Sequence, residues 1–545
     1  MREEPQEDRI EQQRVVDEAA RRRTIAVISH PDAGKSTLSE AMLLHARAIS
    51  QAGATHGKAG RRGTVSDWME MEQARGISIS SAAIQFEVGD VIVNLVDTPG
   101  HADFSEDTYR VLAAVDAAVM LIDAAKGMEA QTVKLFDVCA DRGIPIVAMI
   151  NKWDRPGKDA LELMDEVRDV TGMRPMPLTW PVGMSGHMVG LRHVESGDLE
   201  LYERTAGGAQ VAESRRVDGR EAEEVAGADW STAVDESELV TLDGGEYDRD
   251  AFLDRTGIPV LFGSAVQNIG VAHLLDFVRD EAPAARPRLD VDGNPRAVTA
   301  GFSAQVFKIQ ANMDPAHRDR LAFLRVCSGV FERGMTTQHA QSGRPFATKY
   351  AQQMFGQERQ TVEQAWPGDI VGLVNASSLR PGDTLHGEDA VRFAGMPRFA
   401  PEVFALASPA DSSTAKKFRK GIAQLAEEGV VQLLESERRG VQTPMLGAVG
   451  EMQFEVAAQR MQVDFSAAMR LSPLPYTVVC RVDPADVALL EGRRDLEIAR
   501  RDDEYLALFA DLWRLRALRR DMPDLVLEPL GRAIDEATGA APRRA

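Results

Sequence analysis

Five consecutive residues carry groups suited to phosphate chemistry: Asp97, Thr98, Pro99, Gly100 and His101. They directly follow the apolar run 91–96, which predicts a buried strand with these residues at its carboxyl end. Asp97 is suited to hold Mg²⁺ through its water shell, and Gly100 lets its backbone N–H approach a terminal phosphate. His101 then lies where an attacking water has to be oriented. The alternative, a histidine that only fills a loop before a helix, explains none of its neighbours.

A phosphate-binding loop is expected upstream, between an apolar strand at 24–28 and an amphipathic run from 37 to about 48. A strand, a loop and a helix in this order make a P-loop, in which backbone N–H groups and the helix N-terminus bind phosphates. We expect Lys35 to reach the β- and γ-phosphates and the Ser36 hydroxyl to bind Mg²⁺. The pattern departs from its usual form at Ser29, where a glycine is expected. The full loop consists of Ser29, His30, Pro31, Asp32, Ala33, Gly34, Lys35 and Ser36.

The base is expected to be guanine, because Asn151, Lys152, Trp153 and Asp154 follow the apolar strand 145–150. The Asp154 carboxylate can accept hydrogen bonds from N1–H and the amino group of guanine. Adenine offers neither donor there, so the acceptor would be left unpaired. Ser264 and Ala265 follow a further strand and are expected near the guanine O6. The ligands are therefore GTP and GDP, and Lys35, Gly100 and His101 predict an enzyme that converts GTP and water to GDP and phosphate.

A switch loop is expected between these motifs, within residues 67–79. Such a loop needs a hydroxyl that binds Mg²⁺ only while the γ-phosphate is present. Ser78 is the candidate, which gives Ser36, Ser78 and Asp97 as the expected metal ligands. The alternative for Ser78 is an exposed serine on a strand.

These segments together resemble the G domain of the translational GTPases, which include elongation factor G, and within them the family of bacterial peptide-chain release factor three. Ser29 is typical of that family, whereas most other translational GTPases have Gly at this position. Ser78 is also typical of it, whereas most other translational GTPases have Thr there. Residues 100–110 also follow it, apart from Ala102, where an acidic residue is expected. The resemblance spans roughly 20–470 and is strongest in the blocks 29–36, 67–79, 97–101, 151–154, 263–265, 307–320, 366–370 and 446–450.

The resemblance implies a ribosome-stimulated GTPase that promotes dissociation and recycling of class-I release factors after peptide release. It implies the ribosome as the partner that places His101. Because no arginine is recognisable as one that would stabilise the transition state, we expect slow hydrolysis without this partner. From the cysteines and the short apolar stretches we expect a cytoplasmic protein, and we expect a monomer. Two alternatives remain open. One is a ribosomal-protection or stress-type factor that displaces another ribosome ligand, and the other is a GTP-gated binding module with little hydrolysis.

The expected architecture is multidomain, with room for about three domains in 545 residues. A polar N-terminal extension (1–20) precedes an α/β P-loop GTPase domain (21–285), in which strands and helices alternate. Alternating apolar runs with Gly-Asp turns predict a β-barrel domain at 300–395. An α+β domain is expected at 400–545, with a helical region at 485–520 in which Leu508, Leu512 and Leu515 form a core face.

Much of the negative charge of the chain is concentrated in one segment. The chain has a net charge of −21, and residues 194–250 hold 17 Asp/Glu against 5 Lys/Arg, a net of −12, in a polar insert of the GTPase domain. Because an acidic chain does not favour RNA, ribosome binding is expected to rely on local basic patches. The alternative for each patch is a solvated surface. The two candidates are Arg318, Arg320 and Arg325, and Lys416, Lys417, Arg419 and Lys420.

The three cysteines, Cys139, Cys327 and Cys480, lie far apart in core-like segments without metal or disulfide spacing. They are expected to be buried thiols in a reducing compartment. No apolar stretch approaches the ~20 residues needed to cross a bilayer, so no membrane association is expected.

Overall fold

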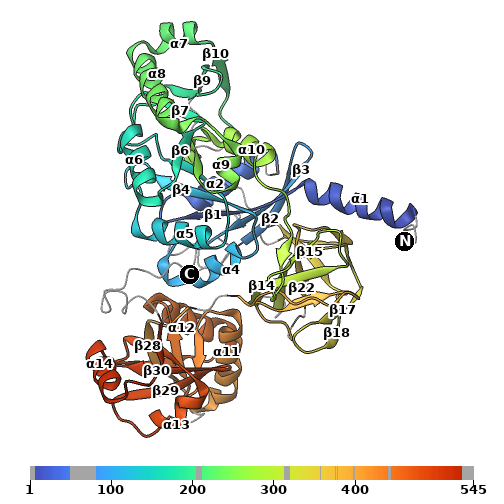
Figure 1. Ribbon diagram of the computed structural model, residues 1–545, viewed down its shortest axis with the longest axis vertical. Helices are drawn as coiled ribbons and strands as arrows, with labels where there is room; N and C mark the ends of the chain where they lie inside the picture. Colours follow the sequence, from blue (N-terminus) through green and yellow to red (C-terminus); the bar gives the residue numbers. More distant parts are fainter. Residues whose placement is uncertain are drawn as a thin grey trace. The chain divides into compact units, whose positions relative to one another are not determined.

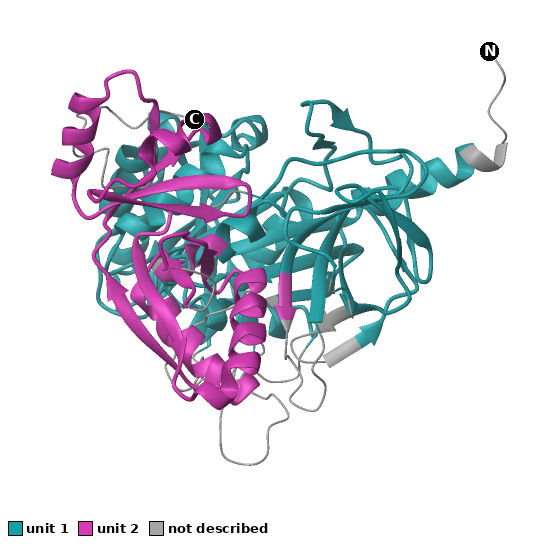
Figure 2. Cartoon of the chain, turned by 90° about the horizontal axis from the view of Figure 1, so that it is seen from below, with its two compact units in different colours: residues 1–101, 107–308, 319–396 teal, residues 102–106, 309–318, 397–545 magenta. Residues whose placement is uncertain are grey.

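The computed structural model describes residues 6–48, 82–203, 211–311, 320–355, 358–374, 376, 378–396, 399–439 and 443–530. Ser78 and the switch loop around it therefore lie outside the described residues. The chain divides into two compact units (Figure 2). The first comprises residues 1–101, 107–308 and 319–396, and the second 102–106, 309–318 and 397–545.

The first unit begins with helix α1 (Gln6–Ala20) and a seven-stranded sheet in the order β2-β3-β1-β4-β5-β11-β6. Figure 1 shows α1 and labels the strands β1, β2, β3, β4 and β6 of this sheet. Neighbouring strands are parallel, except that β2 and β3 are antiparallel. The carboxyl ends of the parallel strands share one edge, where ligands bind in open α/β sheets. The strands are β1 (Arg22–Ser29), β2 (Ala82–Val88), β3 (Val91–Asp97), β4 (Ala117–Asp123), β5 (Ile146–Asn151), β6 (Arg174–Pro177) and β11 (Gly257–Phe262).

Helices cover both faces of this sheet. Ile25 and Val27 belong to the core beneath α2 and α10, while Ala26 and Ile28 are fully buried on the other face, where α5 packs on β1. This alternation is the period of two that a strand imposes. The helices are α2 (Lys35–His45), α4 (Ser105–Leu112), α5 (Ala130–Asp141), α6 (Ala160–Thr171), α9 (Arg249–Leu253) and α10 (Val271–Asp280), with short turns η1 (Ala102–Phe104) and η4 (Ala265–Gln267).

The acidic insert is folded, and its sheet begins at Thr179, upstream of the expected start at 194. Its sheet has the order β10-β9-β8-β7, followed by two helices and a π-type turn. Helix α8 buries Trp230, Ala233, Ser237 and Val240, which follow helical spacing. Two of these residues are small, so the apolar periodicity was too weak to reveal the helix. The elements are β7 (Thr179–Val182), β8 (Gly190–His193), β9 (Leu199–Tyr202), β10 (Ser214–Val217), α7 (Gly219–Ala226), α8 (Ala228–Val240) and η3 (Thr241–Gly245).

The expected β-barrel domain is an eight-stranded sheet in the order β18-β17-β23-β14-β15-β22-β19-β20. Figure 1 shows the curl of this sheet in its labelled strands β14, β15, β17, β18 and β22. A hairpin of β12 (Arg288–Leu289) and β13 (Pro295–Arg296) precedes it, and β16 (Phe331–Glu332) pairs with β21 (Gln364–Ala365). The main strands are β14 (Ser303–Ala311), β15 (Arg320–Ser328), β17 (Thr336–His339), β18 (Arg344–Ala347), β19 (Ala351–Phe355), β20 (Glu358–Thr361), β22 (Ile370–Val374) and β23 (Thr384–His386).

Buried ion pairs connect this sheet to the seven-stranded sheet within the first unit. Arg22 Nε lies 2.8 Å from Asp369 Oδ2, and Arg325 Nη2 lies 2.6 Å from Asp116 Oδ2. Arg325 is only 2% exposed. The expectation that Arg325 contributes to a surface basic patch is therefore wrong, because its charge is used inside the protein to hold Asp116. Arg318 lies outside the described residues.

The second unit is an α+β structure with two four-stranded sheets, in the orders β25-β26-β24-β27 and β29-β30-β28-β31. Helices α11 and α12 pack on each other, and the residues facing inward from α11 are Phe418, Ile422 and Leu425. The expected basic residues of α11 remain exposed. The elements are β24 (Val403–Pro409), η5 (Ser412–Thr414), α11 (Ala415–Glu428), β25 (Gln432–Leu434), β26 (Met445–Ala448), α12 (Glu451–Phe465), β27 (Met469–Leu474), β28 (Val478–Val482), η6 (Pro484–Asp486), α13 (Val487–Leu490), β29 (Leu496–Arg501), β30 (Glu504–Phe509), α14 (Leu512–Asp521) and β31 (Leu527–Leu530).

The continuous helical region expected at 485–520 is wrong. Residues 496–509 form the hairpin β29–β30, whose register pairs Arg501 with Glu504 across a turn at Asp502. Asp502 has φ 52, the left-handed conformation that Asp tolerates in tight turns. Leu508 and Leu515 are core residues as expected, but they lie on β30 and α14 rather than on one helix.

Cys139, Cys327 and Cys480 are buried free thiols, as the sequence predicts. None of the helices in the described part of the chain has the length and apolar character needed to span a bilayer.

Candidate active site

The loop expected to bind phosphates connects the end of β1 at Ser29 to the start of α2 at Lys35. Gly34 precedes the helix with φ 104, and a Cβ there would lie 2.7 Å from Asn151 Nδ2. Only glycine fits this conformation and this space. Lys35 Nζ donates to Ser29 Oγ at 3.0 Å, and Ser29 Oγ donates to the His30 carbonyl at 2.6 Å. The serine that replaces the usual glycine thus holds the lysine side chain over the loop.

His30 fixes the loop to the neighbouring helix. Its side chain is fully buried, and Nδ1 lies 2.8 Å from Oε2 of Glu129, the residue that precedes α5. Burial lowers the pKa of His30, while the charge of Glu129 acts in the opposite direction. The sequence analysis did not identify Glu129, because nothing in its local sequence marks it as a loop anchor.

The segment 97–101 lies against this loop. Asp97 pairs with Val27 in the register of β3 and β1, and Thr98 Oγ1 donates to the Val27 carbonyl at 2.7 Å. A Cβ on Gly100 would overlap Lys35 Nζ. The Gly100 backbone therefore touches the side chain expected to contact the γ-phosphate, and His101 follows directly at a partly exposed position.

Asn151 joins the phosphate loop to the base-binding loop. Its Nδ2 donates to the Ala33 carbonyl at 2.8 Å, and its Oδ1 accepts from the Ala265 N–H at 2.8 Å. Lys152 extends the same connection, since its ammonium donates to the Asp32 carbonyl and to Asp123 Oδ2, the latter at 2.8 Å.

Asp123 is a residue of this site that the sequence analysis missed, although it ends the apolar strand β4. Burial by itself would raise the pKa of Asp123, but hydrogen bonds from Lys152 and the Ala125 N–H outweigh it and hold the pKa below its usual value. The carboxylate is thereby kept charged and fixes Lys152.

A pocket with a volume of about 100 Å³ lies beside Asp154, where the sequence predicts that the base binds, and is called the base pocket below. Ser264 Oγ donates to Asp154 Oδ1 at 2.6 Å and fixes the carboxylate. The Trp153 ring packs in the core at 5.1 Å from Phe262, so it supports the loop rather than the pocket wall. Beyond Asp154, the lining includes Gln267 and Ile269 and, from the insert, Met188, Val189 and Tyr202. The insert residues carry no motif that could have revealed this role.

The donor set at the phosphate end fits Mg²⁺. Asp97 supplies a buried carboxylate next to the start of the loop, and Ser36 supplies a hydroxyl in the first turn of α2. Oxygen ligands are those that Mg²⁺ prefers, and the ion keeps several waters in such sites. Ser78 lies outside the described residues, so its expected contribution stays a prediction.

Comparison with known proteins identifies the family. Peptide chain release factor 3 of Symbiobacterium thermophilum is 45% identical over 524 residues, covering 95% of this chain and 99% of the relative. The chain belongs to the peptide chain release factor 3 family. The factor of Gloeobacter violaceus is 47% identical over 467 residues, covering 85% and 87%, and that of Rippkaea orientalis is 42% identical over 525 residues, covering 95% and 97%.

Models of three protein families match consecutive segments of the chain. The elongation factor Tu GTP binding domain matches residues 20–284, elongation factor G domain 2 matches 301–388, and the class II release factor RF3 C-terminal domain matches 393–519. A crystal structure of a Thermus thermophilus protein shares the fold, with a TM-score of 0.67 at 23% identity over 89% of this chain and 71% of the other.

This release factor 3 family member is thus a guanine-nucleotide-binding GTPase of translation termination. Family membership favours that function over a ribosomal-protection factor and over a binding module with little hydrolysis.

Proposed function

We propose that this chain hydrolyses GTP on the ribosome and thereby promotes dissociation and recycling of class-I release factors after peptide release. The observation that carries the catalytic part is the contact of the Gly100 backbone with Lys35. It brings the two segments expected to bind the γ-phosphate to one point at the carboxyl edge of the sheet, and His101 follows immediately.

The loop residues bind the phosphates, with Lys35 and the backbone N–H groups of residues 32–36 compensating negative charge as the γ-phosphoryl group leaves. Asp97 and Ser36 are the described residues that would hold Mg²⁺, with Ser78 as the proposed third. Mg²⁺ neutralises charge on the β- and γ-phosphate oxygens when it is bound. Asp154 and the Ser264–Ala265 loop select guanine, because a buried carboxylate acceptor penalises any base without matching donors.

His101 orients the attacking water. Orientation is favoured over proton abstraction, since a neutral imidazole is a weak base for a water molecule, and positioning dominates catalysis of phosphoryl transfer. Among the described residues, no arginine is assigned the role of stabilising charge in the transition state. Turnover in the free protein is therefore slow, and contact with the ribosome raises it by placing His101.

Within the second unit, the segment directly after His101 contacts the start of α12. Asp103 Oδ2 accepts a hydrogen bond at 2.9 Å from the N–H of Met452, in the first turn of α12. A carboxylate at a helix N-terminus is favoured by the helix dipole. A Cβ on Gly450 would overlap the Asp103 carboxyl group.

We further propose that the factor acts as a monomer in the cytoplasm. GTP and GDP states can change the ribosome only through different affinities for it. In the GTP-bound state the factor would bind more tightly to the ribosome without a class-I release factor. In the GDP-bound state it would dissociate from the ribosome.

The catalytic part is tested with His101→Ala and a matched control, His187→Ala, which changes an exposed histidine of the same domain. GTP and GDP affinities are measured first, and GTP hydrolysis is then followed with and without 70S ribosomes. We expect His101→Ala to bind both nucleotides normally and to lose ribosome-stimulated turnover, while His187→Ala behaves as the wild type. Unchanged turnover in His101→Ala would contradict the mechanism.

A further inference from the structure

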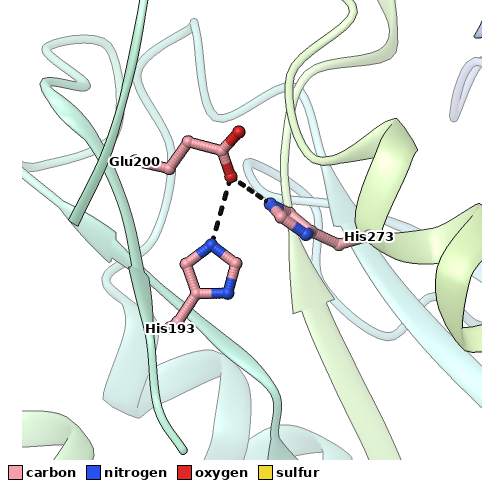
Figure 3. A group of neighbouring side chains, drawn as sticks. All are labelled: His193, Glu200 and His273. Carbon is pink, nitrogen blue, oxygen red and sulfur yellow. Dashed lines mark hydrogen bonds and ion pairs between the residues drawn. The ribbon is translucent and has the colours of Figure 1, made fainter. Parts of the chain in front are cut away.

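Two histidines and a glutamate converge where the acidic insert meets α10, outside the catalytic residues (Figure 3). The same carboxylate oxygen, Glu200 Oε2, lies 3.1 Å from His193 Nε2 and 2.6 Å from His273 Nε2. The three side chains are between 12% and 14% exposed. Each side chain is therefore largely, but not completely, removed from solvent.

The fold sets this arrangement through two separate elements. His193 ends β8, and Glu200 lies in β9 directly opposite Leu191. Residues 191 and 193 share one face of the strand, so His193 and Glu200 are diagonal neighbours on one side of the hairpin. His273 comes from the first turn of α10. The cluster thus connects the insert to the helix that follows the base-binding loop.

The donor set has the chemistry of a transition-metal site. Imidazole nitrogens suit Zn²⁺ and its neighbours, and two histidines with one glutamate form a known three-ligand zinc set with a further position for water. Ligand atoms about 2.1 Å from a tetrahedral ion lie about 3.4 Å apart. The three ligand atoms here all lie within 4.8 Å of one another, so small side-chain movements are sufficient.

We propose that His193, Glu200 and His273 bind a divalent transition-metal ion of the Zn²⁺ class, which links the β8–β9 hairpin to α10. The site is distinct from the oxygen-ligand Mg²⁺ site at Ser36 and Asp97. It adjoins the base pocket, because Tyr202 lines that pocket and its hydroxyl lies 3.2 Å from His273 Nε2. A bound ion would hold this wall of the pocket in place.

One charged neighbour opposes cation binding. The exposed Arg216 guanidinium lies 3.1 Å from His193 Nε2. Coulomb repulsion requires it to move aside when an ion enters, and its exposure allows this movement. Removing this charge is therefore expected to strengthen binding, an effect that loss of folding cannot imitate.

The experiment uses the untagged full-length protein, treated with a chelator and then saturated with GDP in excess Mg²⁺ to keep the nucleotide site filled. Zn²⁺ alone is titrated by calorimetry, and Co²⁺ alone by the visible absorption of its tetrahedral complexes. The ligand variants are His193→Gln, Glu200→Gln and His273→Gln, and Arg216→Gln tests the opposing charge. The matched control is His339→Gln, which removes one histidine paired with a carboxylate, Asp383, at 3.0 Å in the β-barrel domain.

We expect one equivalent of Zn²⁺ to bind the wild type and to raise its melting temperature. Each ligand variant should lose affinity by at least about 100-fold, the control should match the wild type, and Arg216→Gln should bind more tightly. The proposal is overturned if the wild type binds no equivalent of Zn²⁺, if the three ligand variants retain it, or if Arg216→Gln binds more weakly. The cluster would then be a hydrogen-bonded link without metal.

Discussion

Replacing Gly100 with Ala tests the contact on which the catalytic proposal rests. The new Cβ would overlap Lys35 Nζ and would lie 3.3 Å from Lys35 Cε and 3.4 Å from Pro31 Cα. The loop backbone is held by Asn151, so the lysine ammonium is the group that gives way. It must retreat by on the order of 1 Å to restore ordinary contact distances.

A misplacement of that size in a catalytic site costs about 100-fold in rate, which corresponds to about 2.7 kcal/mol of transition-state stabilisation. The assay is single-turnover GTP hydrolysis with saturating ribosomes, together with GDP affinity from displacement of a fluorescent analogue. We expect hydrolysis to fall about 100-fold, with a smaller change in GDP binding.

The matched control is Gly395→Ala. Gly395 is an exposed glycine without positive φ, and an added Cβ there meets no atom within 4 Å. This variant should hydrolyse GTP at the wild-type rate. If Gly100→Ala also retained wild-type hydrolysis, the Gly100 backbone would not control the position of Lys35, and the assignment of both residues would fail.

Three further predictions concern recognition and stability. Ser264→Ala removes the hydrogen bond that fixes the Asp154 carboxylate. A hydrogen bond to a charged group contributes roughly 1.5 kcal/mol, so displacement of fluorescent GDP should show about 10-fold weaker GDP binding. Unchanged GDP affinity would argue against a role of Ser264 in fixing Asp154. Asp116→Ala leaves the buried Arg325 guanidinium without its carboxylate partner. Urea denaturation should then show that the free energy of unfolding of the first unit falls by about 3–5 kcal/mol. A loss below about 1 kcal/mol would mean that water reaches the Arg325 guanidinium. Burial raises the pKa of Cys480 to about 12, so the thiol of the folded protein should resist alkylation at pH 8. Because the thiol of the unfolded chain ionises at lower pH, the free energy of unfolding should fall as pH rises above about 9. Rapid alkylation of Cys480 in the native protein would contradict this prediction.

The positions of the expected nucleotide motifs at the ends of strands were predictable because each motif is local in sequence. The phosphate loop, residues 97–101 and residues 151–154 each directly follow an apolar strand, so their common position at one edge of a parallel sheet follows from topology. The three-part architecture was also predictable from the change from alternating strands and helices to consecutive strands.

Partners distant in sequence were not predictable. Glu129 holds His30, and Asp123 holds Lys152, yet neither belongs to a recognisable motif. Arg325 looked like a surface cation because a single sequence does not reveal that Asp116 faces it across 209 positions. Their roles depend on tertiary packing, which sequence periodicity does not encode.

The error at 485–520 has a local cause. Leu508, Leu512 and Leu515 follow helical spacing, which suggested one helix face. In the structure Leu508 lies on β30 and Leu515 on α14, and the two belong to different core clusters, so the spacing across the strand–helix boundary is coincidental. The decisive feature is the tight turn at Asp502, whose positive φ closes the β29–β30 hairpin. The base-pocket wall from the insert, including Tyr202, was missed for a related reason, since its strands are only four residues long.

The central claim is that GTP hydrolysis by this factor recycles class-I release factors. The most direct test is multiple-turnover peptide release from termination ribosomes with limiting class-I release factor and GTP, with and without this protein. The account predicts faster recycling with GTP, none with GDP, and loss of the effect in His101→Ala. Unchanged recycling in the presence of ribosome-stimulated GTP hydrolysis would contradict the recycling role and favour displacement of a different ribosome ligand.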